Sequence, residues 1–527
     1  MPQLSRHARQ LRAVLGPGGA VPRLASRGAL EHAGAAAPLS LHPHARRARG
    51  DGWGNLRRAR GGCGPRDDRA AIATAARRRG AHSARVARHE RRHRARAVSA
   101  GLFAVKAISA AAEAGEQPLI RVLSLPSLTA FGIGSIIGTG IFVLTGTAAA
   151  NHAGPALVVS FLLAGCAGAF AALSYAELAS MIPIAGSAYS YAYATLGELA
   201  AWFIGWNLVL EYTFSVGTVA VGWSAYVVSL LAQFGIHLPE ALIGAPIDRG
   251  PGDVGLIVTG AVLNLPAVLI VAVVAYICYI GIRQSAAINF AFVVLKIAVV
   301  LGFVLLGAGF VNPANWHPFV PANTGHFGHF GWSGVFAAAG IMFFAFIGFD
   351  TISTCSQEAR NPRRDVPLGI VSSLAICSVL YVATALVLTG MVPYSDLDVA
   401  APVALAIDAH AELRWLGLPV KLGAIVAMIS VMLVMTVGQA RIFMAMAADG
   451  LLPSWFASVH PRFRTPAHST VVTWVGATLI AALLPVRILG ELVSIGTLCA
   501  FVTVCVGVLI LRRLRPELPR RFRVPAP

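Results

Sequence analysis

The chain has 527 residues, of which 56% are hydrophobic and only 12% are charged, whereas soluble globular chains carry roughly 25% charged residues. This composition and a mean hydropathy of +0.70 exclude an ordinary soluble enzyme. Several apolar runs of about 20 residues, the length that crosses the hydrocarbon core of a bilayer, predict an all-α polytopic membrane protein. The formal net charge of +19 would suit a polyanion-binding protein, but its distribution along the chain does not.

The positive charge lies in the N-terminal tail. Residues 1–100 contain 22 arginines and 5 acidic residues, while residues 101–527 contain 20 basic and 18 acidic residues. Because the first 100 residues have no long apolar run, we expect residues 1–117 to be disordered. We favour a translated upstream segment that is not part of the working protein; the alternatives are an arm that binds lipid or nucleic acid, or a targeting segment. Trp53 is the one aromatic residue among the first 100, so no nucleic-acid partner is expected.

Metal, disulfide and enzyme motifs are not found in the sequence. None of the seven cysteines forms a CxxC pair, and most lie in apolar segments. This pattern favours cysteines that are small buried hydrophobic residues over cysteines that bind a metal or form disulfides. His326 and His329 stand three residues apart in a Gly- and Phe-rich loop, where a turn is favoured over a metal site. Without a phosphate-binding loop, a zinc-protease motif or a nucleophile elbow, the chain is predicted to be no enzyme and to need no cofactor. The cysteines are Cys63, Cys166, Cys278, Cys355, Cys377, Cys499 and Cys505.

Ten apolar spans are predicted after Pro126, joined by short connections rich in Pro, Gly, Asn and Asp. They form a transporter core over residues 118–511, which is followed by a basic cytoplasmic segment at 512–527. The predicted spans are 127–149, 156–180, 198–232, 255–281, 286–310, 331–356, 367–392, 418–446, 468–485 and 489–511.

The basic residues of the core predict its orientation, because cytoplasmic loops retain Lys and Arg. With the N-terminus inside, the inner side collects fifteen basic residues and the outer side collects four, namely Arg249, Arg414, Lys421 and Arg487. We therefore expect both termini to be cytoplasmic in a multi-pass protein of the cell membrane.

Two spans are interrupted near their middles. The first reads FGIGSIIGTGIF over 131–142, and the sixth reads FFAFIGFDTIS over 343–353. Glycines and an acid at mid-depth disfavour a continuous helix, and unpaired backbone there is tolerated only beside a cavity. Because the interruptions lie five spans apart, we expect spans 1–5 and 6–10 to form inverted repeats whose broken helices meet at a substrate site. Close helix packing is the alternative use of such glycines.

Five ordered segments resemble the amino acid-polyamine-organocation family, especially its bacterial members that are similar to cationic amino acid transporters. They are GIGSIIGTGIF in the first span, PIAGSAYSYAY at 183–193, GWNLVLEYTFSVGTVAVGWSAY at 205–226, NPRRDVPLGI at 361–370 and GQARIFMAMAADGLLP at 438–453. The resemblance covers roughly 120–527. It implies the five-plus-five inverted-repeat transporter fold and transport of free amino acids or related amines. The family usually has twelve spans, so spans 11 and 12 are expected to be missing from this chain.

A free amino acid needs donors for its carboxylate and acceptors for its ammonium. Unwinding of the first span at 138–140 would free N–H groups at the positive end of a half-helix. Unwinding of the sixth span at 344–347 would free C=O groups, and Phe344 resembles the family's aromatic lid, with simple packing as the alternative. The predicted substrate-binding residues are Ile136, Gly138, Thr139, Gly140, Phe344, Ala345 and Ile347.

Lys296 interrupts an apolar run in the fifth span about ten residues from either end, too deep for its ammonium to reach water comfortably. The family resemblance places it where sodium-coupled relatives of the same fold bind a cation between spans 1 and 8. We therefore expect Lys296 to couple proton entry to substrate entry. The alternative is a permanently charged strut bonded to backbone carbonyls.

Five other residues are candidates for a gate, a pocket or a helix cap. Glu211 is buried in the third span and either lies near the cavity or ties that span to its neighbours. Asp350 is expected to cap the inner half of the sixth span. Glu177, near the inner end of the second span, is a candidate for either of two roles, a gate residue or a helix cap. Met428 and Ser430 in span 8 are candidates for the distal pocket, which suits apolar and polar side chains alike.

The predicted function is proton-coupled symport of amino acids by alternating access, with amino acids, protons and the lipid bilayer as partners. One alternative is exchange of amino acids or amines without net proton movement. The other is a transport-dead or sensor protein. The sequence predicts neither the transported amino acid nor the oligomeric state.

Overall fold

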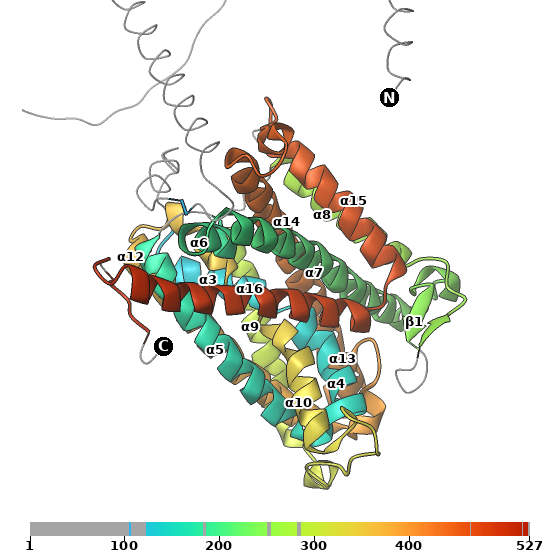
Figure 1. The fold of residues 1–527 in the computed structure, drawn as a ribbon. Coiled ribbons are helices and arrows are strands. Elements are labelled where there is room, and N and C mark those ends of the chain that lie inside the picture. The colour runs from blue at the N-terminus through green and yellow to red at the C-terminus, as the bar shows by residue number, and fades with distance from the viewer. Residues whose placement is uncertain are drawn as a thin grey trace, which may run out of the picture. The chain divides into compact units, whose positions relative to one another are not determined.

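The computed structural model describes residues 105–106, 123–182, 186–249, 255–281, 286–463, 465–518 and 520–524. Most of the tail that the sequence predicts to be disordered, 1–104 and 107–117, lies outside the described residues. The described part is helical apart from loops and one small hairpin (Figure 1).

Seven helical stretches among the described residues are long and apolar enough to cross a membrane, so the chain is a multi-pass membrane protein. Three shorter apolar helices, α3 (Leu125–Ile136), α8 (Leu265–Ile280) and α15 (Ala467–Leu483), lie at the predicted spans 1, 4 and 9. Because these three helices are shorter than the other spans, the predicted total of ten spans stays a prediction. The long spans include α5 (Leu157–Met181), α7 (Glu198–Gln233), α9 (Ala286–Gly307), α12 (Pro362–Met391), α14 (Arg414–Ala448) and α16 (Val486–Leu514).

The predicted fourth span starts too early. Residues 255–264 are not helical; they include strand β2 (Leu256–Val258), which pairs antiparallel with β1 (Ile247–Arg249). Helix α8 begins only after Asn264, whose side-chain oxygen accepts from the Ala267 N–H at 3.2 Å. The apolar residues of β2 extend the hydropathy signal, but the N-cap sets the helix start.

The helices pack as two related halves. Each of α5, α7 and α8 packs on the span five positions later, which is α12, α14 and α15 respectively. The contact of α3 with α12 has its counterpart between α10 (Gly331–Met342) and α5. In Figure 1, α8 and α15 lie side by side, apart from α5 and α10. This pairing is the pattern that the predicted five-plus-five inverted repeat requires.

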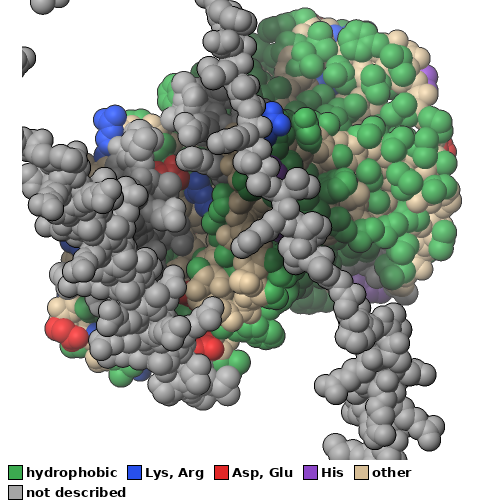
Figure 2. Space-filling view, turned by 90° about the horizontal axis from the view of Figure 1, so that it is seen from above, with side chains coloured by type: hydrophobic (Ala, Val, Ile, Leu, Met, Phe, Trp, Pro, Cys, Tyr) green, Lys and Arg blue, Asp and Glu red, His purple; other side chains and the backbone are tan. Residues whose placement is uncertain are grey.

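Apolar side chains cover much of the surface. Figure 2 shows hydrophobic side chains gathered over one side of the face that it displays. Phe170 on α5, Leu305 on α9 and Leu479 on α15 are each more than half exposed. In water such a surface would drive association, whereas the acyl chains of a bilayer are its natural solvent.

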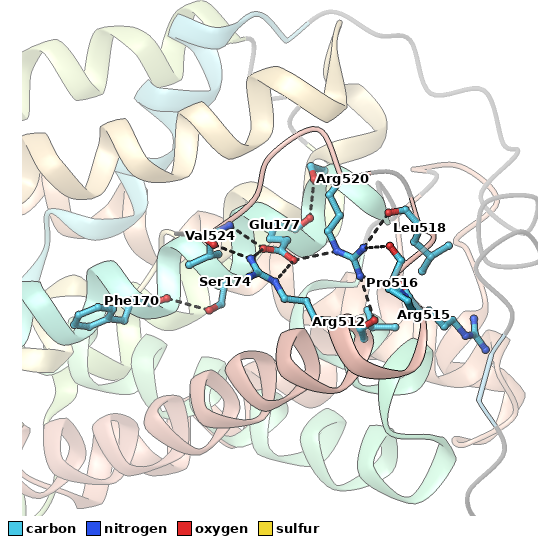
Figure 3. Close-up of polar contacts among 11 residues, drawn as sticks. Phe170, Ser174, Glu177, Arg512, Arg515, Pro516, Leu518, Arg520 and Val524 are labelled. Atoms are coloured by element: carbon cyan, nitrogen blue, oxygen red, sulfur yellow. Dashed lines mark hydrogen bonds and ion pairs between the residues drawn. The ribbon is translucent and has the colours of Figure 1, made fainter. Parts of the chain in front are cut away.

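Glu177, near the end of α5, lies among donors from the C-terminal segment (Figure 3). Arg512 donates from Nε to Oε1 (3.0 Å) and from Nη2 to Oε2, and the Val524 N–H donates to Oε2 (2.8 Å). The Nε of Arg520 lies 3.4 Å from Oε1. These contacts favour a third role for Glu177 beside the gate and the cap: it ties α5 to α16 and to the segment that follows.

Arg512→Ala is expected to lower the free energy of unfolding by about 3 kcal/mol, the low end for breaking a buried ion pair, because the Val524 N–H and Arg520 remain beside the buried Glu177 carboxylate. Thermal unfolding of the purified protein in detergent measures the loss. Arg513→Ala is the matched control, since Arg513 is the next residue of the same helix and is exposed. Equal stability of the two variants would contradict a structural role for the Glu177 cluster.

Lys106, one of the two described residues of the predicted tail, contacts the core. Its Nζ donates to Asp449 Oδ1 at 2.6 Å, and its backbone N–H donates to the Tyr193 carbonyl at 3.1 Å. The Tyr189 hydroxyl donates to the other oxygen of Asp449 at 2.8 Å. Burial and the neighbouring Asp449 raise the pKa of Tyr189, so its hydroxyl keeps the proton that it donates. These bonds join the tail, α6 (Ser187–Thr195) and the end of α14.

A chain that begins at Pro118 is expected to insert and to bind substrate with an affinity within about fivefold of the full chain, because a partly exposed ion pair contributes ~1 kcal/mol or less. Equilibrium binding to the two purified forms measures this. The full chain with Lys106→Met separates the ion pair from the rest of the tail. If the shortened chain loses binding and Lys106→Met keeps it, the tail is a functional arm.

Candidate functional site

The first span breaks where its glycines predict. Helix α3 ends at Ile136, and Ile137 is extended with ψ 104°. Helical structure resumes as a π-helical turn, η1 (Gly140–Leu144), that continues toward the outer end. The first N–H groups of this second half have no intrahelical partner by geometry, and they lie at the positive end of the half-helix.

The sixth span breaks in the same way. Helix α10 passes into a short 3₁₀ turn, η8 (Phe343–Phe346), and Ile347 is extended with ψ 138°. Gly348 has φ +121°, a conformation that L side chains rarely adopt. The chain then re-enters a helix at α11 (Thr351–Thr354).

The two breaks touch each other. A Cβ placed on Gly140 would lie 2.5 Å from the Ala345 Cα, and one placed on Gly348 would lie 2.9 Å from the Ser135 backbone. The Thr351 hydroxyl donates to the Ser135 Oγ at 3.0 Å across the same contact. Glycine at 140 and 348 therefore lets one unwound backbone lie against the other.

Side chains from other spans donate hydrogen bonds to the backbone carbonyls that are freed in the first span. Lys296, fully buried on α9, donates to the Gly134 carbonyl at 2.6 Å and to the Ile137 carbonyl at 3.1 Å. Tyr381 on α12 donates to the Ile136 carbonyl at 2.9 Å. Both acceptors of Lys296 belong to the first span, so these bonds hold the break open from one side.

A small cavity of about 20 Å³ lies between the breaks. Two hydroxyl oxygens of its lining, Thr139 Oγ1 and Ser215 Oγ, are buried and have no hydrogen-bond partner among the described residues. A buried hydroxyl without a partner costs about 1–3 kcal/mol, so both are suited to a ligand. The volume holds no amino acid, which means that the structure is closed around this point.

Six of the seven predicted substrate-binding residues line this cavity: Ile136, Gly138, Thr139, Gly140, Phe344 and Ile347. The seventh, Ala345, instead fills the space beside Gly140. Phe344 is 7% exposed and lies at the cavity wall; its role as a lid stays a prediction.

The walls from the other spans were largely missed from the sequence. Ser215 and Val219 on α7 and Val431 and Met435 on α14 line the cavity, but Met428 and Ser430 do not. Met428 lies three residues before Val431 and seven before Met435, on the same face of α14. Helical periodicity starting from Met428 therefore predicts both lining residues. Ser430 lies on a different face, and its buried hydroxyl has no partner among the described residues.

Asp350 occupies the N-cap position of α11, but its side chain makes no capping hydrogen bond, which corrects the predicted capping role. Asp350 Oδ2 instead accepts from the Tyr212 hydroxyl at 2.7 Å and from the Ser187 hydroxyl at 3.2 Å. Asp350 thus joins the sixth span to α7 and α6.

Glu211 is buried on α7, and neither of its carboxyl oxygens has a hydrogen-bond partner among the described residues. It does not line the cavity between the breaks. This placement favours a position between spans over direct contact with the ligand.

Residues 123–527 match the family model described as amino acid permease. A methylthioribose transporter of Bacillus subtilis is 47% identical over 79% of this chain and 86% of its own length, and a branched-chain amino acid permease of the same organism is 46% identical over the same shares. A cationic amino acid transporter of Arabidopsis thaliana is 39% identical over 76% of this chain and 64% of its own length. The crystal structure of MhsT in complex with L-phenylalanine has a TM-score of 0.51 at 14% identity, covering 75% of this chain and 90% of that one, which supports the transporter fold alone.

Proposed function

The chain belongs to the amino acid permease family, and from that premise we propose that it carries free amino acids across the cell membrane by alternating access around the two helix breaks. Both termini lie in the cytoplasm in this proposal, as the basic residues predict. The inverted repeats rock about the contact between the breaks and open the cavity to one side at a time.

The cavity between the breaks is the observation that carries this proposal. It presents the N–H groups of the half-helix at Gly138–Gly140 to a carboxylate and the turn at Phe344–Ile347 to an ammonium. The hydroxyls of Thr139 and Ser215, which have no hydrogen-bond partner within the described part of the chain, add polar contacts. The remaining lining is apolar, including Val219 and Met435, and would contact the amino acid side chain.

Proton coupling through Lys296 is the second part of the proposal. The residue is fully buried and donates to two carbonyls of the broken first span. A buried ammonium is costly without a carboxylate partner, which favours release of its proton. The neutral amine is a weaker donor than the ammonium, so release of the proton would weaken the two bonds that join the first span to α9. Protonation in one access state and deprotonation in the other would link proton movement to the substrate cycle.

A transport screen tests the function. Uptake of each of the twenty amino acids, and of 5-methylthioribose, is measured into proteoliposomes and into liposomes without protein. The sugar is included because a relative that is 47% identical is a methylthioribose transporter. We expect saturable uptake of at least one amino acid and none of the sugar. Uptake of the sugar alone would overturn the proposed substrate class, and no uptake at all would favour a transport-dead or sensor protein.

The competing mode is exchange of one amino acid or amine for another without net proton movement. An exchanger carries labelled substrate only when the vesicles hold unlabelled substrate. We expect uptake into empty vesicles when the outside is more acidic than the inside. A requirement for internal substrate, with no response to the pH gradient, would favour exchange.

A further inference from the structure

The segment that follows α16 folds back on the end of that helix (Figure 3). Arg520 lies at its centre, where one nitrogen of the guanidinium donates to the Leu511 carbonyl at 3.1 Å and to the Arg515 carbonyl at 3.0 Å. Arg512 closes the segment by donating to the Val524 carbonyl at 2.8 Å. Residues 512–524, which we call the basic turn, therefore have a defined structure at the predicted inner end of α16.

The basic turn carries more positive charge than its own contacts use. It contains six arginines and one acidic residue, Glu517, which is exposed. Arg512 and Arg520 pair with the buried carboxylate of Glu177. The other four arginines have no acidic partner among the residues that the structure describes, and they are Arg513, Arg515, Arg521 and Arg523. The turn therefore presents a surface of net positive charge.

Arg513 continues the face of α16 that is suited to contact lipid. Ile495, Val502 and Leu509 are exposed and recur every seven residues, so they share one face of this helix. Arg513 is exposed and lies one helical turn beyond Leu509 on the same face. One turn of α-helix rises about 5.4 Å. Because the predicted span ends at residue 511, the Arg513 guanidinium is expected at the level where the acyl chains end and the lipid phosphates begin.

The neighbours of Arg513 suit the same kind of ligand. Leu514 is 74% exposed, and acyl chains are the natural solvent for an apolar side chain at this level. Arg521 and Arg523 are exposed in the returning part of the turn. Guanidinium groups donate paired hydrogen bonds to phosphate oxygens. The basic turn thus combines donors for a phosphate with an apolar contact at the edge of the membrane.

We propose that the basic turn binds the headgroup of an anionic phospholipid in the leaflet at the predicted inner end of the protein. A zwitterionic headgroup offers the same phosphate but adds a positive group that the arginines repel, so the surface prefers a headgroup with net negative charge. None of the residues of the basic turn lines the cavity of the central site between the breaks. The proposal therefore depends on the membrane setting and not on the transported substrate.

Native mass spectrometry of the delipidated full chain in non-ionic detergent measures the bound lipid. Dioleoyl phosphatidylglycerol and dioleoyl phosphatidylcholine are titrated separately, because they share their acyl chains and differ in the charge of the headgroup. A basic residue near an anionic surface contributes a factor of about five to binding. Because Glu517 offsets one of the three exposed arginines, we expect the wild type to bind phosphatidylglycerol at least about tenfold more tightly than phosphatidylcholine. Equal binding of the two lipids would overturn the proposal.

Two triple variants test whether the preference belongs to the basic turn. Replacing each of the three exposed arginines of the turn with glutamine should lower the preference to below about threefold; the changes are Arg513→Gln, Arg521→Gln and Arg523→Gln. The matched control removes the same charge from three exposed arginines near the start of α12, by Arg360→Gln, Arg363→Gln and Arg364→Gln. It should keep the preference of the wild type. An equal loss in both triple variants would overturn the proposal, because total charge would then attract the lipid.

Inorganic phosphate tests the other source of the same chemistry. It is added to the wild type with bound phosphatidylglycerol and compared with sodium chloride at the same ionic strength, which screens charges equally. We expect phosphate to displace no more lipid than chloride does, because a free anion has no acyl chains to contact Leu514 and the face of α16. Greater displacement by phosphate would overturn the lipid assignment in favour of a soluble anion.

Discussion

Replacing Gly140 with valine is expected to abolish amino acid transport while the protein stays folded in the membrane. A Cβ at this position would lie 2.5 Å from the Cα and 2.6 Å from the Cβ of Ala345. Because one of these atoms is backbone, the two breaks must move apart to relieve the overlap. We expect affinity at the central site to fall by about 100-fold, which is the size of the effect that a misplacement of about 1 Å has on the rate at a catalytic site.

Gly138→Ala is a milder change in the same break, and its expected effect is smaller. A Cβ at Gly138 would lie 3.1 Å from a terminal methyl group of Val431 and 3.8 Å from its other nearest atoms, so a small side-chain shift accommodates it. We expect a loss below about tenfold, or ~1.4 kcal/mol. The measurement is uptake of the best-transported amino acid by both variants at equal membrane content. Unchanged uptake by Gly140→Val would contradict a site at the contact of the breaks.

Replacing Lys296 with methionine is expected to abolish accumulation driven by a pH gradient and to leave some exchange. Methionine keeps much of the apolar stem but cannot carry a proton or donate to the carbonyls of Gly134 and Ile137. The measurement is uptake into proteoliposomes at equal substrate concentration, with and without an inward proton gradient. Wild type should accumulate substrate only when the gradient is present. Lys296→Met should accumulate no substrate with or without the gradient.

Lys421→Met is the matched control for Lys296→Met. Lys421 is also a buried lysine of a membrane span, but it pairs with Asp408 at 3.2 Å at the predicted outer end of α14. We expect this variant to keep its dependence on the gradient. If Lys296→Met accumulates substrate to the same gradient-dependent extent as wild type, Lys296 is a strut and the proposed coupling is wrong.

The helix breaks could be predicted because they depend on residues that are close together in the sequence. Four glycines within nine residues at 132–140, and Gly348 next to Asp350 in an otherwise apolar span, disfavour continuous helix whatever packs around them. The lining residues at these breaks followed, since unwound backbone must face a cavity. The buried position of Lys296 was also predictable from local sequence, because its distance from both ends of the span determines its depth in the membrane.

The partners across the fold could not be predicted. Nothing near Gly140 in the sequence indicates that Ala345, more than 200 positions away, fills the space of its missing side chain. Tyr381 bonds a carbonyl of the first break from α12, and a tyrosine in an apolar span gives no sign of its acceptor. The sequence also placed Asp350 at a helix start correctly but not the direction of its carboxylate, which Tyr212 and Ser187 determine.

An experimental structure of the protein saturated with its best-transported amino acid tests the central claim most directly. We predict that the ligand lies between the two breaks, with its carboxylate against the backbone N–H groups of Gly138–Gly140 and its ammonium against the carbonyls of Phe344–Ile347. A ligand found only elsewhere, with the contact of Gly140 and Ala345 unchanged and the cavity between them still empty, would contradict the account.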